Sequence, residues 1–192
     1  MNLLLEDVTL KLIEDAKEVF EDRKIVLGDG NLDSIVMLIG EAPGAEEEKE
    51  GRPFVGKAGK NLMKFLDSIS VSREQVYISN VVKIRPFKVN PKSGRIVNRP
   101  PNKEELEFFK PYLEMEIKAL KPEIIVTLGN VPLQAVLKST DAVIGNYHGK
   151  IVMVDDTKVF PLYHPAAIIY NQSLASIYEQ DVEELRKVIE NR

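Results

Sequence analysis

An apolar run that ends in a glycine- and proline-rich turn restricts the fold of this chain more than any other feature. Residues 35–39 are all apolar, Gly40-Glu41-Ala42-Pro43-Gly44 follows at once, and a helix-forming stretch covers about residues 57–69. A short, continuous apolar run between turn signals is typical of a strand that is buried on both faces. In open α/β sheets, ligands bind at the carboxyl ends of such strands, where backbone N–H groups are free. The turn therefore predicts both a fold class and the place of a site.

The rest of the chain alternates between strand-like and helix-like segments. Strands are expected at about 75–82, 123–128, 150–155 and 158–163, and helices at about 3–21, 103–120, 132–137 and 181–190. Such alternation predicts an α/β fold, a three-layer α/β/α sandwich with a mainly parallel central sheet. We expect one domain over residues 1–192, on which residues 1–24 pack as an N-terminal helix. Residues 84–102 contain four prolines and are expected to form a long irregular loop.

Composition excludes several kinds of site. The 192 residues include no cysteine and only two histidines, His148 and His164. Disulfides, thiolate catalysis and cysteine-ligated metals are therefore excluded, and no metal site is expected. No apolar run approaches the roughly 18–20 residues of a membrane span. We accordingly expect a cytoplasmic protein, monomeric by default, with no membrane partner.

Positive charge is concentrated in one segment although the net charge is −4. Residues 83–103 contain seven cations and no acid: Lys83, Arg85, Lys88, Lys92, Arg95, Arg99 and Lys103. A local basic field attracts phosphate even on an acidic protein. Charge alone leaves a solvated, mobile loop as an equal alternative.

Five segments in order resemble the uracil-DNA glycosylase superfamily, most closely its family 4. They are Gly40-Glu41-Ala42-Pro43-Gly44, Gly51-Arg52-Pro53-Phe54-Val55-Gly56, Asn80-Val81-Val82-Lys83 followed by Arg85-Pro86, Ile125-Val126-Thr127-Leu128-Gly129, and His164-Pro165-Ala166-Ala167. The resemblance implies the α/β/α sandwich expected above. It also implies a DNA repair enzyme that flips uracil out of DNA and hydrolyses its bond to deoxyribose, leaving an abasic site.

The chain departs from family 4 at the cysteines that hold a 4Fe–4S cluster. Ile84 and about Phe109 stand at two of those positions, and the N-terminal helix supplies no cysteine. We therefore expect no iron–sulfur cofactor and expect apolar packing in its place. The stretch from Lys88 to Arg99 is similar in length to that of relatives that crosslink to uracil-DNA through a histidine. Asn98 stands nearest that histidine, and Ala42 replaces their glutamine, so turnover is expected instead.

The resemblance places the uracil-binding site at Glu41, Ala42, Glu47, Phe54, Asn80 and His164. Phe54 is expected to stack on the flipped uracil. Asn80 is expected to accept from N3–H and to donate to O4, and cytosine presents the reverse pattern at these atoms. His164 is expected to donate to O2 as negative charge develops on the leaving base.

Roles for the remaining candidates are less direct. Water is expected to be oriented by Asn80 or, indirectly, by Glu41, because Ala42 stands where the best-known family has an aspartate; Glu41 has the alternative of holding its loop through backbone N–H groups. Glu47 is a candidate for excluding the methyl group of thymine. Ile168 or Ile169 is a candidate wedge into the DNA, with the start of a buried helix as the alternative. Phosphate contacts are expected from Lys83, Arg85, Arg95 and Arg99.

Three other functions compete with uracil excision. A non-catalytic module that binds damaged DNA is consistent with Ala42 and with the missing cysteines. A glycosylase for other deaminated bases is disfavoured by Asn80, where relatives of that kind often carry aspartate. A nucleotide-binding enzyme would need the G-x-G-x-x-G pattern, which is missing here. His148 has no assigned role.

Overall fold

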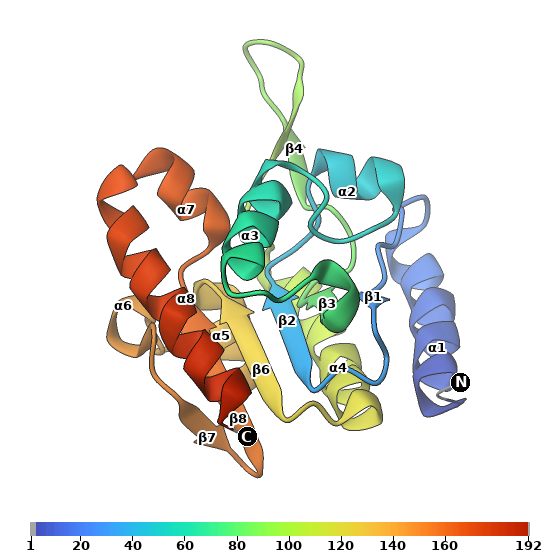
Figure 1. The fold of residues 1–192 in the computed structure, drawn as a ribbon. Helices are drawn as coiled ribbons and strands as arrows, with labels where there is room; N and C mark the ends of the chain where they lie inside the picture. Colours follow the sequence, from blue (N-terminus) through green and yellow to red (C-terminus); the bar gives the residue numbers. More distant parts are fainter. Residues whose placement is uncertain (1–2, 192) are drawn as a thin grey trace.

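A six-stranded sheet forms the centre of the molecule in the computed structural model, which describes residues 3–191 (Figure 1). The strand order is β1-β3-β2-β6-β8-β7. The four inner strands are parallel: β2 (Val36–Gly40), β3 (Tyr77–Asn80), β6 (Ile124–Leu128) and β8 (Thr157–Leu162). The two edge strands are antiparallel to their neighbours: β1 (Asp29–Gly30) and β7 (Val152–Val154).

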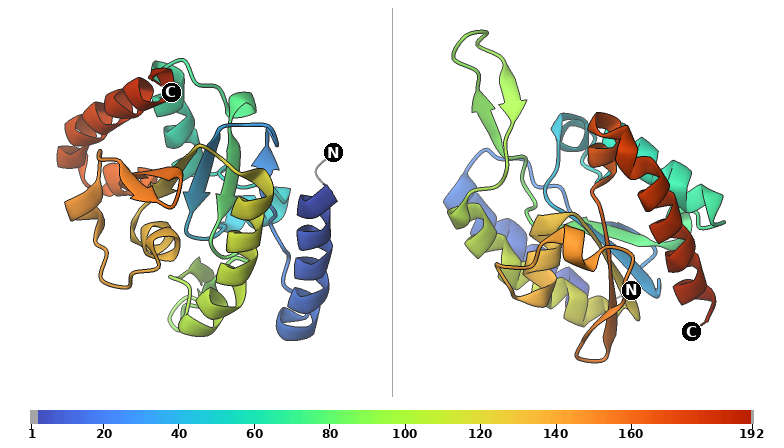
Figure 2. Two further views of the ribbon diagram at one scale, coloured as in Figure 1. Left: turned by 90° about the horizontal axis from the view of Figure 1, so that it is seen from below. Right: turned by 90° about the vertical axis from the view of Figure 1, so that its left-hand side faces the viewer.

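Helices cover both faces of the sheet. One face packs on α3 (Lys57–Ser68) and α8 (Ala175–Glu190). The other packs on α1 (Leu3–Phe20), α4 (Lys103–Leu120) and α5 (Asn130–Leu137). Side chains alternate along β2, so that Leu38 faces the first layer and Met37 faces the second. The expected α/β/α sandwich is confirmed, and its layers are seen end-on in Figure 2.

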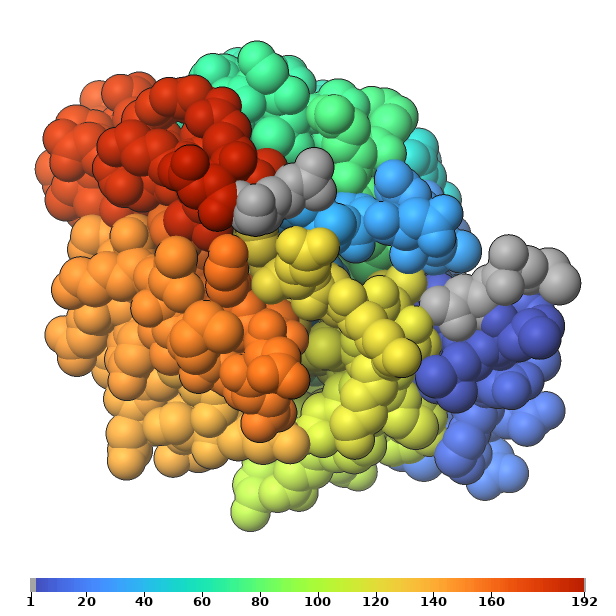
Figure 3. Space-filling model, turned by 60° about the horizontal axis from the view of Figure 1, so that its bottom comes forward, coloured from blue at the N-terminus to red at the C-terminus, as the bar shows by residue number. Residues whose placement is uncertain are grey.

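The connections place a crevice at the carboxyl end of β2. The chain leaves β2 towards α3 on one face, and it leaves the neighbouring β6 towards α5 on the other. Adjacent strands whose connections diverge in this way open the crevice in which α/β proteins bind ligands. The opposite end of the molecule is formed by the last turns of α8, the segment before β6 and the β7–β8 turn (Figure 3).

An aromatic cluster joins α1 to α4. The rings of Phe20 and Phe109 stack with centroids 5.4 Å apart, and Phe108 packs edge-on against both. Ile84 is fully buried in the same core and pairs with Ile25 in an isolated bridge. Apolar side chains therefore fill the volume around residues 84 and 109, as expected.

The expectation of an irregular loop at 84–102 is wrong. Strands β4 (Phe87–Val89) and β5 (Ile96–Asn98) form an antiparallel hairpin that projects from the body (Figures 1 and 2). The four prolines made an irregular loop the expected structure. All four lie at or outside the strand ends, where a proline removes no ladder hydrogen bond, so they are compatible with the hairpin. Helix α8 also begins earlier than expected, at Ala175.

Short helices complete the fold. They are α2 (Ala45–Glu50), η1 (Arg73–Gln75), α6 (Ile144–Tyr147), α7 (Pro165–Tyr170) and η2 (Gln172–Leu174). Among residues 3–191, no helix combines the length and the apolar character needed to cross a membrane.

Candidate active site

Three loops converge on Gly40, the last residue of β2. Gly40 pairs in register with Asn80 at the end of β3. A Cβ atom at Gly40 would lie 2.5 Å from two ring carbons of Phe54 and closer still to Oδ1 of Asn80. The Phe54 ring lies 6.2 Å from the His164 ring, centroid to centroid. The structure thus brings together the three base-binding residues expected from the sequence, and only glycine leaves room for them.

Phe54 is held in an unfavourable backbone conformation. Its φ is 53°, in the left-handed region that a bulky side chain adopts at a cost of about 1–3 kcal/mol. Arg73 stabilises this loop by donating to the carbonyl oxygens of Pro53 (2.7 Å) and Phe54 (3.3 Å). Phe54 is only 7% exposed and belongs to the α3–α8 core. Strain of this kind, maintained by neighbouring groups, is characteristic of ligand-binding positions.

Asn80 carries an unsatisfied acceptor. The residue is 3% exposed, and its buried Oδ1 accepts no hydrogen bond from residues 3–191. Such an atom costs about 1–3 kcal/mol relative to a hydrogen-bonded one. The atom lies beside Gly40 and close to the Phe54 ring, so a ligand bound at this point would supply the missing donor.

His164 is arranged as a neutral hydrogen-bond donor. It caps α7, and its Nδ1 accepts from the N–H of Ala166 (3.1 Å), so the neutral ring carries its proton on Nε2. Burial lowers the pKa of His164, and the nearby carboxylate of Glu47 opposes this shift only in part. The imidazole is therefore uncharged at neutral pH, with an N–H available.

Glu47 joins two of the loops. Its Oε2 accepts from the N–H of Gly44 (3.1 Å), and its Oε1 accepts from those of Val55 (3.1 Å) and Gly56 (2.8 Å). Both oxygens are thus committed to backbone, which argues against the expected contact with a thymine methyl group. Sequence reasoning missed this role, although a glutamate three residues after the helix cap at Gly44 is the signal of a capping box.

Glu41 and Ala42 occupy the turn itself. The Glu41 side chain is half-buried and makes no hydrogen bond or ion pair within residues 3–191. It therefore does not hold the loop, a role that Glu47 fills. Burial raises the pKa of Glu41. Ala42 packs against the α1–α4 layer.

The expected phosphate contact by Lys83 is wrong. Lys83 is 2% exposed, and its Nζ lies 2.6 Å from Oε2 of Glu116 and also contacts Oγ of Ser79. Glu116 in turn accepts from the hydroxyl groups of Tyr77 (2.9 Å) and Ser79. This buried network was missed because Glu116 lies 33 residues further along the chain.

The other expected phosphate contacts separate into two kinds. Arg99 donates to both oxygens of Glu105 at 2.7 Å, and Arg85 donates to Glu48 at 3.1 Å. Arg95 is exposed and has no ion pair within the described residues. Of the four expected contacts, Arg95 is thus the one that remains fully available to a phosphate.

Ile168 is not a wedge. It is 9% exposed and packs in the α3–α8 core. The next two residues of α7 point outwards instead, with Ile169 44% and Tyr170 88% exposed. A rotation of about 100° around the helix, one residue, separates the buried side chain from the exposed one, and the sequence alone does not show which is which.

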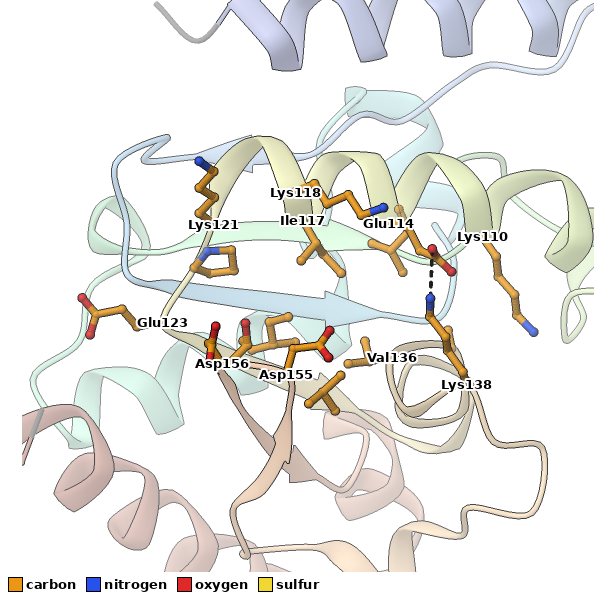
Figure 4. Close-up of a pocket in the computed structure, with 16 residues that line it drawn as sticks. Lys110, Glu114, Ile117, Lys118, Lys121, Glu123, Val136, Lys138, Asp155 and Asp156 are labelled. Carbon is orange, nitrogen blue, oxygen red and sulfur yellow. Dashed lines mark ion pairs between the residues drawn. The ribbon is translucent and has the colours of Figure 1, made fainter.

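A separate groove lies elsewhere on the molecule. A groove of about 470 Å³ runs between α4, α5 and the β7–β8 turn, at the opposite edge of the sheet (Figure 4). Its apolar floor includes Ile117 and Val136, and the Glu114–Lys138 ion pair closes one side. None of the candidate site residues lines it. His148, also outside the site, binds Asp181 through Nδ1 (2.8 Å) and packs on Tyr163, beside the His164 loop.

Comparison with known proteins identifies the family. The family model for the uracil DNA glycosylase superfamily matches residues 27–189. A type-4 uracil-DNA glycosylase of Saccharolobus solfataricus is 36% identical, over 88% of this chain and 78% of that protein. The type-4 enzyme of Archaeoglobus fulgidus is 39% identical, over 83% of this chain and 79% of that protein. The type-4 enzyme of Thermotoga maritima is 37% identical, over 86% of this chain and 83% of that protein. The chain therefore belongs to the uracil DNA glycosylase superfamily.

Proposed function

We propose that this protein is a monofunctional uracil-DNA glycosylase that hydrolyses the N-glycosidic bond of uracil in DNA and leaves an abasic site. Its similarity to type-4 uracil-DNA glycosylases over most of both chains supports the activity. The observation that carries the proposal is the buried, unpaired Oδ1 of Asn80, which lies beside Gly40 together with the Phe54 ring. A flipped uracil offers the donor that this atom lacks.

Recognition uses Asn80 and Phe54. The N3–H of uracil donates to Oδ1, and the amide nitrogen of Asn80 donates to O4. Cytosine has an acceptor at N3 and a donor at C4, so both contacts become mismatched. Leaving buried polar groups unpaired is the strongest means of rejecting an analogue. Stacking on Phe54 adds about 1–3 kcal/mol of binding free energy and does not distinguish one base from another.

Departure of the base is assisted by His164. As the N1–C1′ bond breaks, its electron pair leaves with uracil, and negative charge spreads to O2. The neutral imidazole donates its Nε2–H there, a contact that is strongest in the transition state. One such donor contributes about 3–4 kcal/mol.

Water activation is assigned to Glu41. Asn80 is committed to the base, whereas the Glu41 carboxylate is half-buried and unpaired. The carboxylate accepts a proton as the water oxygen bonds to C1′. An oxocarbenium-like transition state demands little from the nucleophile, so one imperfectly placed carboxylate suffices.

The enzyme is proposed to act without an iron–sulfur cluster. The sequence contains no cysteine, and Ile84 and Phe109 are fully buried among aromatic side chains. These residues do not fit such a group, which needs thiolate ligands. We further propose a cytoplasmic monomer that inserts Ile169 or Tyr170 into the gap left by the flipped base.

A multiple-turnover assay on a uracil-containing oligonucleotide tests the function. Cleavage after alkali treatment reports abasic sites, with the protein well below the substrate concentration. Wild type is expected to turn over repeatedly, Asn80→Ala and His164→Ala are expected to lose most activity, and Asn146→Ala, at an exposed asparagine of α6, serves as the matched control. Tight binding without cleavage would instead indicate a damage-binding module. Release of hypoxanthine but not uracil would indicate a different base specificity.

A further inference from the structure

The β4–β5 hairpin presents two chemically different faces. Val89 lies directly opposite Ile96, and both side chains are more than half exposed, at 58% and 54%. Lys88 lies one residue earlier, opposite Val97, and therefore points to the other face. The backbone N–H of Asn90 donates to the carbonyl of Arg95, which extends the ladder and puts Arg95 on the Lys88 face. One face is thus apolar and the other is cationic.

The positive charge of the hairpin is not neutralised within the protein. Lys88, Lys92 and Arg95 are all exposed, and none has an ion pair within residues 3–191. Residues 84–102 contain no acid. Charge of this kind is complementary to a polyanion.

The base of the hairpin is fixed beside the candidate active site. Arg85 donates to Asn98 of β5 (2.8 Å) and to Glu48 of α2 (3.1 Å), which links the hairpin to the helix that follows the Gly40–Gly44 turn. Asn98 lies close to that turn, since a Cβ atom at Gly44 would be 3.3 Å from its Nδ2. Arg99, the residue after β5, donates to Glu105 and so attaches the end of this strand to α4. The arm therefore begins at the site and projects away from it (Figure 1).

We propose that the β4–β5 hairpin is an arm that grips double-stranded DNA next to the uracil, with its cations on phosphates and the Val89–Ile96 pair against sugars and base edges. The proposal deepens the proposed function and rests on its action on DNA. A two-stranded ribbon fits a groove about 12 Å wide, as in B-DNA. From Phe87 to the turn, the ribbon reaches about 13 Å at roughly 3.3 Å per residue. A single strand has no groove to receive the apolar face.

Salt dependence of binding tests the cationic face. Binding to undamaged duplex is measured by fluorescence anisotropy, so that the result does not depend on catalysis. The variant Lys88→Gln/Lys92→Gln/Arg95→Gln removes three phosphate contacts. The slope of the logarithm of the binding constant against the logarithm of the salt concentration is therefore expected to become less steep by about 2.7. Between 0.05 and 0.2 M salt, wild type then loses about 40-fold more affinity than the variant does. The matched control, Lys118→Gln/Lys121→Gln/Lys158→Gln, removes three cations from the opposite edge of the sheet and is expected to keep the wild-type slope.

A second variant tests the apolar face. Val89→Thr/Ile96→Thr keeps β-branched side chains, and hence the strands, but removes apolar contact. Duplex affinity is expected to fall at least 5-fold, while affinity for the same strand in single-stranded form stays within 2-fold. Equal losses on both forms, or no loss on either, would overturn the proposal, as would a wild-type slope in the triple variant. Loss of self-association in place of DNA affinity would mean that the pair contacts a second copy instead.

Uracil release by wild type, measured in parallel, separates the two proposals. If wild type releases uracil and the triple variant keeps the wild-type salt slope, the proposal of a DNA-binding hairpin is refuted and the glycosylase proposal is retained. A reduced slope in the variant together with no release in wild type would refute the glycosylase and retain the DNA-binding arm.

Discussion

Lys83→Met removes one partner of the buried pair while keeping most of the side-chain volume. Glu116, 5% exposed, then retains only the hydroxyl groups of Tyr77 and Ser79 as donors. An uncompensated buried charge costs about 3–5 kcal/mol. The cavity contribution is small because methionine fills nearly the same space. We therefore expect the free energy of unfolding to fall by about 4 kcal/mol.

Urea unfolding measures this loss. At an m-value of about 2 kcal/mol/M, the midpoint is expected to move down by about 2 M. Adding Glu116→Gln removes the stranded charge and keeps an acceptor for Tyr77, so the double variant should recover at least half of the loss. Recovery in the double variant assigns the effect to the ion pair rather than to general disruption.

The same variant tests the statement that Lys83 does not contact DNA. The salt slope of duplex binding should be unchanged in Lys83→Met. Lys88→Met, at an exposed position, is the matched control: its stability should stay within about 0.5 kcal/mol of wild type, and its slope should fall by about 0.9. If Lys83→Met unfolded at the wild-type midpoint and lost a full phosphate contact, Lys83 would leave Glu116 to reach DNA, and the reasoning would be refuted.

Three further predictions concern the site. Glu47→Gln removes the negative charge of the carboxylate that accepts from three backbone N–H groups. Charge-assisted hydrogen bonds each contribute about 1.5–3 kcal/mol, so kcat/KM on uracil-DNA should fall about 10–100-fold. An unchanged kcat/KM would show that the two loops do not depend on the charge of Glu47. Because the pKa of His164 is lowered, the unfolded chain binds its proton at higher pH than the folded chain does; stability therefore falls as pH drops through the ordinary histidine range, and thermal melts of His164→Gln should lack that component. Gly40→Ala places a methyl group against the Phe54 ring, so uracil release should drop more than 100-fold while unfolding in urea shows a loss of only about 1–3 kcal/mol; normal release would contradict the convergence at Gly40.

Much of the fold follows from local pattern. The apolar run before Gly40 predicts β2, and the amphipathic stretch at 103–120 coincides with α4, because hydrophobic period and turn residues are properties of neighbouring positions. The roles of Phe54, Asn80 and His164 were predicted from the resemblance of their motifs to the uracil-DNA glycosylase superfamily, not from local pattern. Their convergence then follows from the parallel sheet, which brings the carboxyl ends of its strands to one edge.

Other features depend on partners that are distant in sequence. Lys83 belongs to a basic segment of the sequence, yet it is buried in an ion pair with Glu116. Glu47 lies in an acidic run, yet its role is determined by the hydrogen bonds that it accepts from the N–H groups of Val55 and Gly56. Ile168 and Ile169 are chemically identical neighbours, and only the packing of α7 decides which one is exposed. The sequence by itself thus determined the layers and the motif residues, whereas tertiary structure decided which charges are buried, which loops are joined and which hairpin projects, because these depend on long-range contacts that no local pattern encodes.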